Sequence, residues 1–192
     1  MSEDEPTRPA GIDPRGPRFA AAITSALLLV VVFVGLTTPA VSTASFGWLA
    51  YQPLSGQTFV PGLGSTVLVA RATQPAFLLL VVLALLFLWG VLSPRTMPWA
   101  VIYRRLVQPR LAPPAEWEDP RPPRFAQGVG LAVVTIGIVL HLIGLPLAVP
   151  VSASIAFVAA FLNAAFGVCL GCMMYLGLAR AGLLGRARPS AS

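Results

Sequence analysis

The stretch AFLLLVVLALLFLWGVL, residues 76–92, carries no charged side chain. At a rise of about 1.5 Å per residue, a helix of this length crosses most of the roughly 30 Å hydrocarbon layer of a bilayer. Three other apolar stretches, residues 19–36, 125–149 and 153–178, also lack Asp, Glu, Lys and Arg. Because lipid offers no partners to backbone polar groups, and barrel strands would alternate apolar and polar residues, these stretches predict four transmembrane helices.

The composition of the chain agrees with this interpretation. Of its 192 residues, 56% are hydrophobic and 10% are charged, whereas soluble domains carry about 25% charged residues. We therefore expect an all-α membrane protein with one four-helix domain over residues 19–178. Segment 1–18 precedes that domain and tail 179–192 follows it. Loop 37–75 joins the first two helices, and loop 93–124 joins the second and third.

The distribution of arginine predicts the orientation. The chain contains no lysine, and every arginine except Arg71 lies in the termini or in loop 93–124. The positive-inside rule therefore predicts a multi-pass protein of the plasma (inner) membrane, with both termini and loop 93–124 cytoplasmic. The net charge of +6 then indicates contact with anionic membrane lipids rather than a nucleic-acid partner. Residues 19–36 exceed a usual signal-peptide core, so we expect an uncleaved helix.

Two nearly identical segments precede the first and third helices. We call them the leader segments: DPRGPRFA at residues 13–20 and DPRPPRFA at 119–126. The repetition predicts two parallel helical hairpins, each starting from one leader segment. It singles out Asp13, Arg15 and Arg18 in the first segment and Asp119, Arg121 and Arg124 in the second. The prolines disfavour helix before Arg18 and Arg124, whose side chains would reach lipid phosphates. The alternative is a docking surface for a cytoplasmic partner.

The loops contain further candidates. In the outer loop, Trp48 and Tyr51 are typical of side chains that anchor a protein at the membrane interface. Arg71 marks the outer boundary before the second helix, or alternatively contacts a substrate anion. In loop 93–124, residues 99–107 predict a short amphipathic helix on the inner surface, with Arg104 and Arg105 toward lipid phosphates.

Both cysteines of the chain, Cys169 and Cys172, lie in the fourth apolar stretch. If residues 153–178 form one helix, the spacing of three places both thiols on one face, close enough to bridge. They would lie near the cytoplasmic boundary, where a stable disulfide is not expected. They would also lie far from the helix N-terminus, which would leave their pKa without help from the helix dipole.

The remaining polar and small residues of the helices indicate packing rather than chemistry. Gly167 and Gly171 form a stripe typical of close helix contact, and Asn163 is expected to hydrogen-bond between helices. On a continuous helix the cysteines lie opposite that stripe. His141 falls near the outer face, at the wrong depth to complete a metal site with the thiols. We expect no metal, no cofactor and no nucleophilic triad.

The leader segments and the string FGVCLGC at residues 166–172 resemble a bacterial, mainly actinobacterial, family of integral membrane proteins designated a domain of unknown function. The resemblance extends from Asp13 to about Leu178. It implies that the family's Cys-x-Gly-Cys corresponds to Cys169, Gly171 and Cys172. Genes of such proteins often lie beside those of thioredoxin-like proteins and thiosulfate sulfurtransferases, which implies thiol or sulfur chemistry.

These observations favour a thiol-redox or sulfur-relay protein that uses Cys169 and Cys172 with a thioredoxin-like or sulfurtransferase partner. Two alternatives stay open: a small transporter of a sulfur-containing anion, and a structural membrane subunit without chemistry. A homo-oligomer is compatible with each of them. The sequence contains no recognisable catalytic constellation other than the cysteine pair, so thiol–disulfide or persulfide exchange is the enzymatic activity it leaves open.

Overall fold

The computed structural model describes residues 11–38, 65–114 and 116–182, and only the backbone of residues 65 and 66. Trp48 and Tyr51 lie outside the described residues. In chain order the helices are α1 (Arg15–Thr37), α2 (Ser65–Ala72), α3 (Pro75–Leu92), α4 (Pro98–Ile102), η3 (Tyr103–Val107), η4 (Gln108–Arg110), α5 (Arg121–Leu142), α6 (Ala148–Phe166) and α7 (Leu170–Arg180). Among the described residues, α1, α3, α5 and α6 are long and apolar enough to cross a membrane. The protein is thus an all-helical, multi-pass membrane protein, as predicted.

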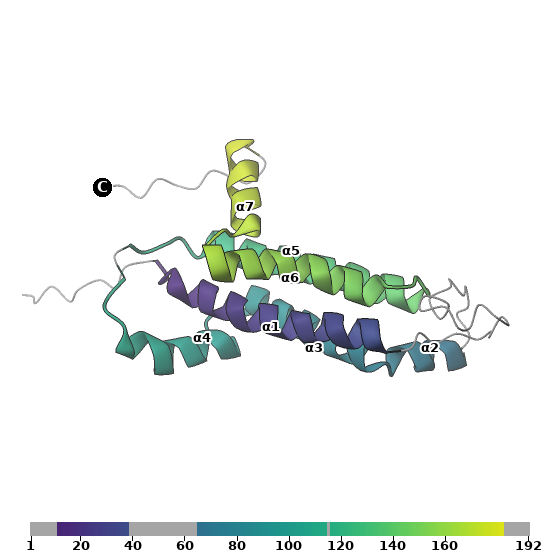
Figure 1. Cartoon of the computed structure of the whole chain (residues 1–192). Helices are drawn as coiled ribbons and strands as arrows, with labels where there is room; N and C mark the ends of the chain where they lie inside the picture. Colours follow the sequence, from purple (N-terminus) through teal and green to yellow (C-terminus); the bar gives the residue numbers. More distant parts are fainter. Residues whose placement is uncertain (1–10, 39–64, 115, 183–192) are drawn as a thin grey trace, which may run out of the picture.

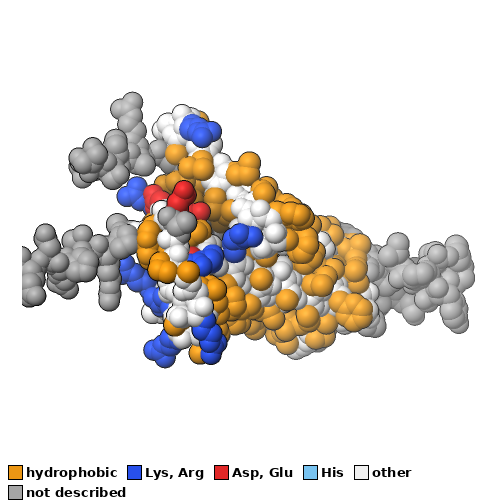
Figure 2. All heavy atoms as spheres, turned by 60° about the vertical axis from the view of Figure 1, so that its left-hand side comes forward, with side chains coloured by type: hydrophobic (Ala, Val, Ile, Leu, Met, Phe, Trp, Pro, Cys, Tyr) orange, Lys and Arg blue, Asp and Glu red, His pale blue; other side chains and the backbone are white. Residues whose placement is uncertain are grey.

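The four long helices lie side by side in an elongated bundle (Figure 1). Each packs on two neighbours: α1 on α3 and α6, and α5 on the same two helices. The largest fully buried side chains among the described residues lie at the centre: Leu28, Val31, Leu80 and Val134. Many other leucines, valines and isoleucines of these helices are exposed, and they form the apolar surface that faces outward in Figure 2. Lipid contact around the bundle follows from this surface.

Small residues let the helices approach closely, as is usual in membrane bundles. A Cβ added to Gly137 of α5 would overlap the side chain of Ser152 on α6. A Cβ on Gly130 would lie 2.6 Å from the ring of Phe87 on α3. Both contacts of α5 therefore depend on the absence of a side chain at these glycines.

The leader prolines were expected to disfavour helix before Arg18 and Arg124, and this expectation is wrong. Helix α1 begins at Arg15 and α5 begins at Arg121, so both extend the expected spans 19–36 and 125–149 at their start. The physical reason is that proline in the first turn sacrifices no helical hydrogen bond, since the first N–H groups have no partner within the helix. The same rule applies to α3, where Pro75 is the first residue, one position before the predicted start.

The fourth predicted span, residues 153–178, is not one helix. The structure has α6 over Ala148–Phe166 and a separate α7 over Leu170–Arg180, turned sharply away from the bundle axis (Figure 1). The third span also ends earlier than expected, at Leu142 rather than at residue 149. Residues 143–147 form the turn between α5 and α6, where Gly144 has φ 100° and Leu147 has φ 60°.

The two ends of the bundle differ in charge. Arginine and acidic side chains gather at one end, whereas the middle of the surface is apolar (Figure 2). The start of α1 and the helix α7 both lie at this arginine-rich end. Loop 93–124, expected to contain a short helix over 99–107, contains a continuous helical segment over residues 98–110, made of α4, η3 and η4. Arg104 and Arg105 are exposed on it, and their contact with lipid phosphates stays a prediction.

Candidate functional site

The cysteine pair lies at a break between two helices. Gly167 ends α6 with φ 71°, and its N–H donates to the carbonyl oxygen of Asn163 at 3.1 Å. This left-handed conformation suits glycine, because other residues carry a Cβ that crowds the backbone there. Cys169 is then extended, with φ −89° and ψ 99°, and it forms the N-cap of α7. Because of this break, the two cysteines lie at the start of a new helix rather than in the middle of a long one.

Cys169 and Cys172 form a disulfide in the structure, with 5.2 Å between their Cα atoms. The backbone N–H of Cys172 donates a hydrogen bond to Sγ of Cys169 at 3.3 Å. Both residues are half-buried. A sulfur that accepts this bond at the N-cap replaces the side-chain oxygen usually found there, and it satisfies one of the free N–H groups of the first turn.

Two expectations about the pair are therefore corrected. The cysteines are not remote from a helix N-terminus, because Cys169 caps α7 and Cys172 lies in its first turn. The positive end of the α7 dipole and a backbone N–H are directed at the sulfur of Cys169, an arrangement that stabilises a thiolate. The pair is also joined as a disulfide, whereas the sequence led us to expect two free thiols at the cytoplasmic boundary.

The glycine stripe is also corrected, because its two members lie on different elements and have different roles. Gly171 packs on α5, where a Cβ would lie 2.5 Å from the Cβ of Ala126. Gly167 instead forms the turn, and a Cβ there would lie 3.6 Å from Cζ of Arg18. The α1 guanidinium thus lies beside the chain break, close to the C-terminal carbonyls of α6. A cation is favourable at that position.

Two predicted residues meet at the opposite end of the bundle. Arg71 is buried, and its Nη1 donates to the carbonyl oxygen of Leu142, the last residue of α5. Nε2 of His141 donates to the carbonyl oxygen of Arg71 at 3.3 Å, and its ring stacks on Phe77 with centroids 5.2 Å apart. Arg71 and His141 therefore connect α2, α3 and α5. The interhelical hydrogen bond expected of Asn163 stays a prediction.

The two leader segments lie side by side at the arginine-rich end. Ile12 and Glu118, each directly before the aspartate of its segment, exchange two backbone hydrogen bonds of 2.8 and 3.0 Å. In the first segment the N–H of Arg15 donates to Asp13 at 3.0 Å. In the second, the N–H of Arg121 donates to Asp119 at 2.9 Å. Both aspartates thus cap the first turn of a membrane helix in the same way.

Asp13 has two additional side-chain partners. Its carboxylate pairs with the Arg15 guanidinium at 3.0 Å and accepts a hydrogen bond of 2.9 Å from the Tyr103 hydroxyl. Burial raises the pKa of the Asp13 carboxyl, but the bonds from Arg15 and Tyr103 outweigh burial and leave that pKa below its ordinary value. Burial, and then the bond to Asp13, raise the pKa of Tyr103 to about 12. Sequence reasoning missed Tyr103, because nothing local connects it with a residue 90 positions earlier.

Within the part of the chain that the structure describes, no group of three or more His, Cys, Asp or Glu side chains is positioned to hold a metal ion. The chemistry-bearing groups that the fold does bring together are the cysteine pair, the start of α7 and, beside the break, Arg18. This arrangement provides a disulfide with one sulfur positioned to become a stabilised thiolate.

Comparison with known proteins identifies a family but no activity. No curated protein and no solved structure matches the chain. The family that does match is described as a domain of unknown function, DUF4395, and the match covers residues 12–180. That range includes both leader segments, all four membrane helices and the cysteine pair. The chain therefore belongs to the DUF4395 family.

Proposed function

We propose that this membrane protein exchanges thiols and disulfides through Cys169 and Cys172. The observation that carries the proposal is the position of the pair: Cys169 is the N-cap of α7, and the N–H of Cys172 donates to its sulfur. Thiolates at helix N-termini have a lowered pKa, and such thiolates are the reactive form in disulfide exchange.

The same position assigns different roles to the two cysteines. In the reduced protein, the Cys169 thiolate attacks a disulfide of a partner, and the partner's leaving sulfur departs as a thiolate that takes up a proton. The Cys172 thiol loses its proton and attacks Sγ of Cys169, which breaks the mixed disulfide and releases the second partner thiol. The pair loses two electrons and two protons, and the partner gains both. The reverse sequence oxidises a partner dithiol.

We further propose that the reaction takes place on the cytoplasmic side of the plasma (inner) membrane. The cysteines lie at the arginine-rich end of the bundle, and the positive-inside rule assigns that end to the cytoplasm. A thioredoxin-like protein, or a sulfurtransferase that carries sulfur on a cysteine, has the chemistry to exchange with the pair. The half-buried sulfurs, at the start of a helix that turns away from the bundle, are within reach of a soluble partner.

We also propose that α1–α3 and α5–α6 are two copies of one hairpin. Three relationships support this repeat: the reciprocal bonds of Ile12 and Glu118, the matching caps Asp13 and Asp119, and the contacts of α1 with α6 and of α5 with α3. If α1 is exchanged with α5 and α3 with α6, each of these contacts maps onto its counterpart in the other copy. In this arrangement the cysteine-bearing α7 packs mainly on α5 of the second copy, with Gly171 against Ala126 and Tyr175 against Phe125.

A trapping experiment tests the proposed exchange. Cys172→Ser leaves Cys169 at the helix start without its resolving thiol, so we expect a stable mixed disulfide with a partner after incubation with cytoplasmic extract. Cys169→Ser is the matched control and should trap at least about tenfold less, because Cys172 lacks the N-cap position. Equal trapping by both variants, or none by either, contradicts the assignment. Identification of the trapped protein by mass spectrometry then distinguishes a thioredoxin-like partner from a sulfurtransferase.

A further inference from the structure

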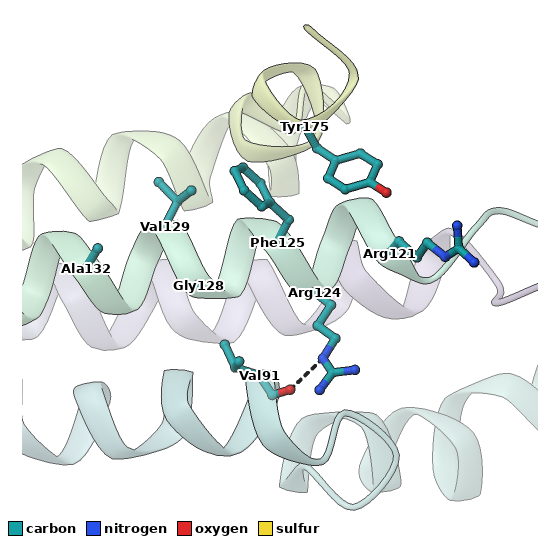
Figure 3. A pocket seen from close by; sticks show the side chains of 8 residues that line it. All are labelled: Val91, Arg121, Arg124, Phe125, Gly128, Val129, Ala132 and Tyr175. Carbon is teal, nitrogen blue, oxygen red and sulfur yellow. Dashed lines mark hydrogen bonds between the residues drawn. The ribbon is translucent and has the colours of Figure 1, made fainter. Parts of the chain in front are cut away.

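A groove opens between α3, α5 and α7 at the arginine-rich end of the bundle (Figure 3). Its volume is about 580 Å³, and eight residues line it: Val91, Arg121, Arg124, Phe125, Gly128, Val129, Ala132 and Tyr175. The two arginines lie at one end, where the Tyr175 hydroxyl also points. The other lining residues are apolar. The groove is therefore cationic at one end and apolar along its length. We call the end with Arg121 and Arg124 the mouth and the apolar lining the floor.

The floor of the groove is a continuous stripe along α5. Phe125, Gly128, Val129 and Ala132 recur at helical spacings of three and four residues and thus share one face of the helix. Apart from its two chain neighbours and the backbone of α5 itself, no atom of the described residues lies within 4 Å of the position that a Cβ of Gly128 would occupy. Protein atoms therefore leave open space over Gly128.

The equivalent place in the first leader segment is already occupied by an anion of the protein itself. Phe19, which corresponds to Phe125, packs on Tyr103 with ring centroids 5.7 Å apart; Phe125 packs on Tyr175 at 5.6 Å. Beside the first ring pair, the Asp13 carboxylate binds both the Arg15 guanidinium and the Tyr103 hydroxyl.

The second leader segment has the same cationic and aromatic groups without that internal anion. Asp119 is exposed and accepts a bond from the backbone N–H of Arg121, not from its guanidinium. Arg124 donates through Nε to the carbonyl oxygen of Val91 at 2.6 Å. Within residues 11–38, 65–114 and 116–182, no carboxylate lies within 4.0 Å of either guanidinium. An external anion would thus supply the negative charge that no described carboxylate provides beside Arg121 and Arg124.

We propose that this groove binds an anionic phospholipid of the surrounding bilayer, with its phosphate between Arg121 and Arg124 and one acyl chain along the floor over Gly128. A phosphate oxygen accepts charge-assisted hydrogen bonds from guanidinium groups, which favour such bidentate contacts. The acyl chain fills the apolar space along the floor, and it thereby provides the van der Waals contacts that the floor residues do not receive from the protein. A free phosphate ion satisfies the mouth but not the floor, so the lipid fits the whole groove.

Native mass spectrometry of the purified full chain tests this proposal. The protein is incubated in detergent with equal amounts of phosphatidylglycerol and phosphatidylcholine of matched chain length, and the retained lipids are counted. We expect retention of phosphatidylglycerol over phosphatidylcholine by about tenfold, because phosphatidylcholine has the same phosphate but its choline cation repels the arginines and cancels the net charge. Arg121→Gln should reduce this preference at least threefold. Arg110→Gln is the control, because Arg110 is an exposed arginine on η4 that does not line the groove.

A second variant tests the acyl-chain contact without a change of charge. Gly128→Leu places a side chain in the open space and should lower retention of both lipids, whereas the melting temperature verifies that the variant folds. Excess inorganic phosphate should leave the retained phosphatidylglycerol unchanged. The proposal is overturned if Arg121→Gln and Arg110→Gln have equal effects. It is likewise overturned if inorganic phosphate displaces the lipid while Gly128→Leu has no effect, which would indicate a simple anion site.

Discussion

The guanidinium of Arg18 lies beside Gly167, with Cζ 3.6 Å from the position that a Cβ of that glycine would occupy. Arg18 belongs to the first leader segment, and Gly167 begins the break that places Cys169 at the start of α7. The relationship connects the most distinctive repeat of the sequence with its only cysteines. It also places a positive charge beside the break that precedes Cys169, and such a charge, like the α7 dipole, favours a thiolate.

Replacement of Arg18 tests that electrostatic contribution. In the reduced protein, Arg18→Gln should slow alkylation of Cys169 by iodoacetamide at neutral pH about twofold to fivefold, because a nearby but exposed charge has a modest, screened effect on thiol pKa. The rate is measured by mass spectrometry. Arg105→Gln removes an equal charge at the same end of the bundle and should leave the rate unchanged. Equal alkylation rates for wild type and Arg18→Gln would show that Arg18 does not contribute to the reactivity of Cys169.

Gly167→Ala tests the helix break. Since φ is 71° at this position, alanine should lower the free energy of unfolding by about 1 kcal/mol. It should also favour continuation of α6 through the break, which removes Cys169 from its capping position and lowers its reactivity. Gly177→Ala, at a helical position with open space around it, is the control and should be neutral or stabilising. Thermal unfolding in detergent and alkylation rates are the two readouts.

Gly171→Leu tests the contact that holds α7 on the bundle. A Cβ at this position approaches Ala126 to 2.5 Å, so leucine must push α7 away from α5. We expect faster proteolysis of α7 and a lower melting temperature, consistent with an overpacking cost of about 1–3 kcal/mol. Gly177→Leu introduces the same side chain into open space. The account is contradicted if the two variants behave alike.

The Asp13–Tyr103 hydrogen bond predicts a pH dependence with a defined sign. The lowered pKa of Asp13 contributes stability that is present above about pH 4 and is lost as the pH falls through the folded pKa. The raised pKa of Tyr103 contributes stability that is lost between about pH 10 and 12. In a rapid pH-jump titration of tyrosine absorbance, Asp13→Asn should shift the Tyr103 transition downward. Asp119→Asn should leave the Tyr103 transition unchanged. Equal shifts in the two variants would show that the hydrogen bond to Asp13 does not raise the pKa of Tyr103.

Hydropathy and proline chemistry explain how far the sequence predicted the fold. The bounds of α3 agree with the prediction to within one residue, because polar Gln74 and Ser93 flank an uninterrupted apolar run. The break after Phe166 escaped prediction, because residues 153–178 stay apolar throughout and glycine is common in membrane helices. Only the positive φ of Gly167 distinguishes a turn from a packing glycine at this position.

The candidate site was predicted in its residues but not in its geometry. Cys169 and Cys172 stood out by type and spacing, yet their relation to a helix N-terminus depends on the conformation of Gly167. The sequence predicts lipid contact for Arg18 and Arg124, whereas it identifies Arg15 and Arg121 only as members of the repeat. Within the described part of the chain, Arg15 pairs with a carboxylate, whereas Arg121 does not. This difference depends on Tyr103, which approaches Asp13 only in the folded bundle.

The redox equilibrium of the Cys169–Cys172 pair tests the central claim most directly. The purified protein is equilibrated in detergent with defined ratios of reduced and oxidised glutathione, the free thiols are alkylated, and the fraction that carries two labels is measured by mass. A pair that exchanges at the start of α7 should be reduced in one two-electron step, with a midpoint between about −180 and −270 mV. A disulfide that remains intact below about −300 mV would instead behave as a structural cross-link, and that result would contradict the proposed function.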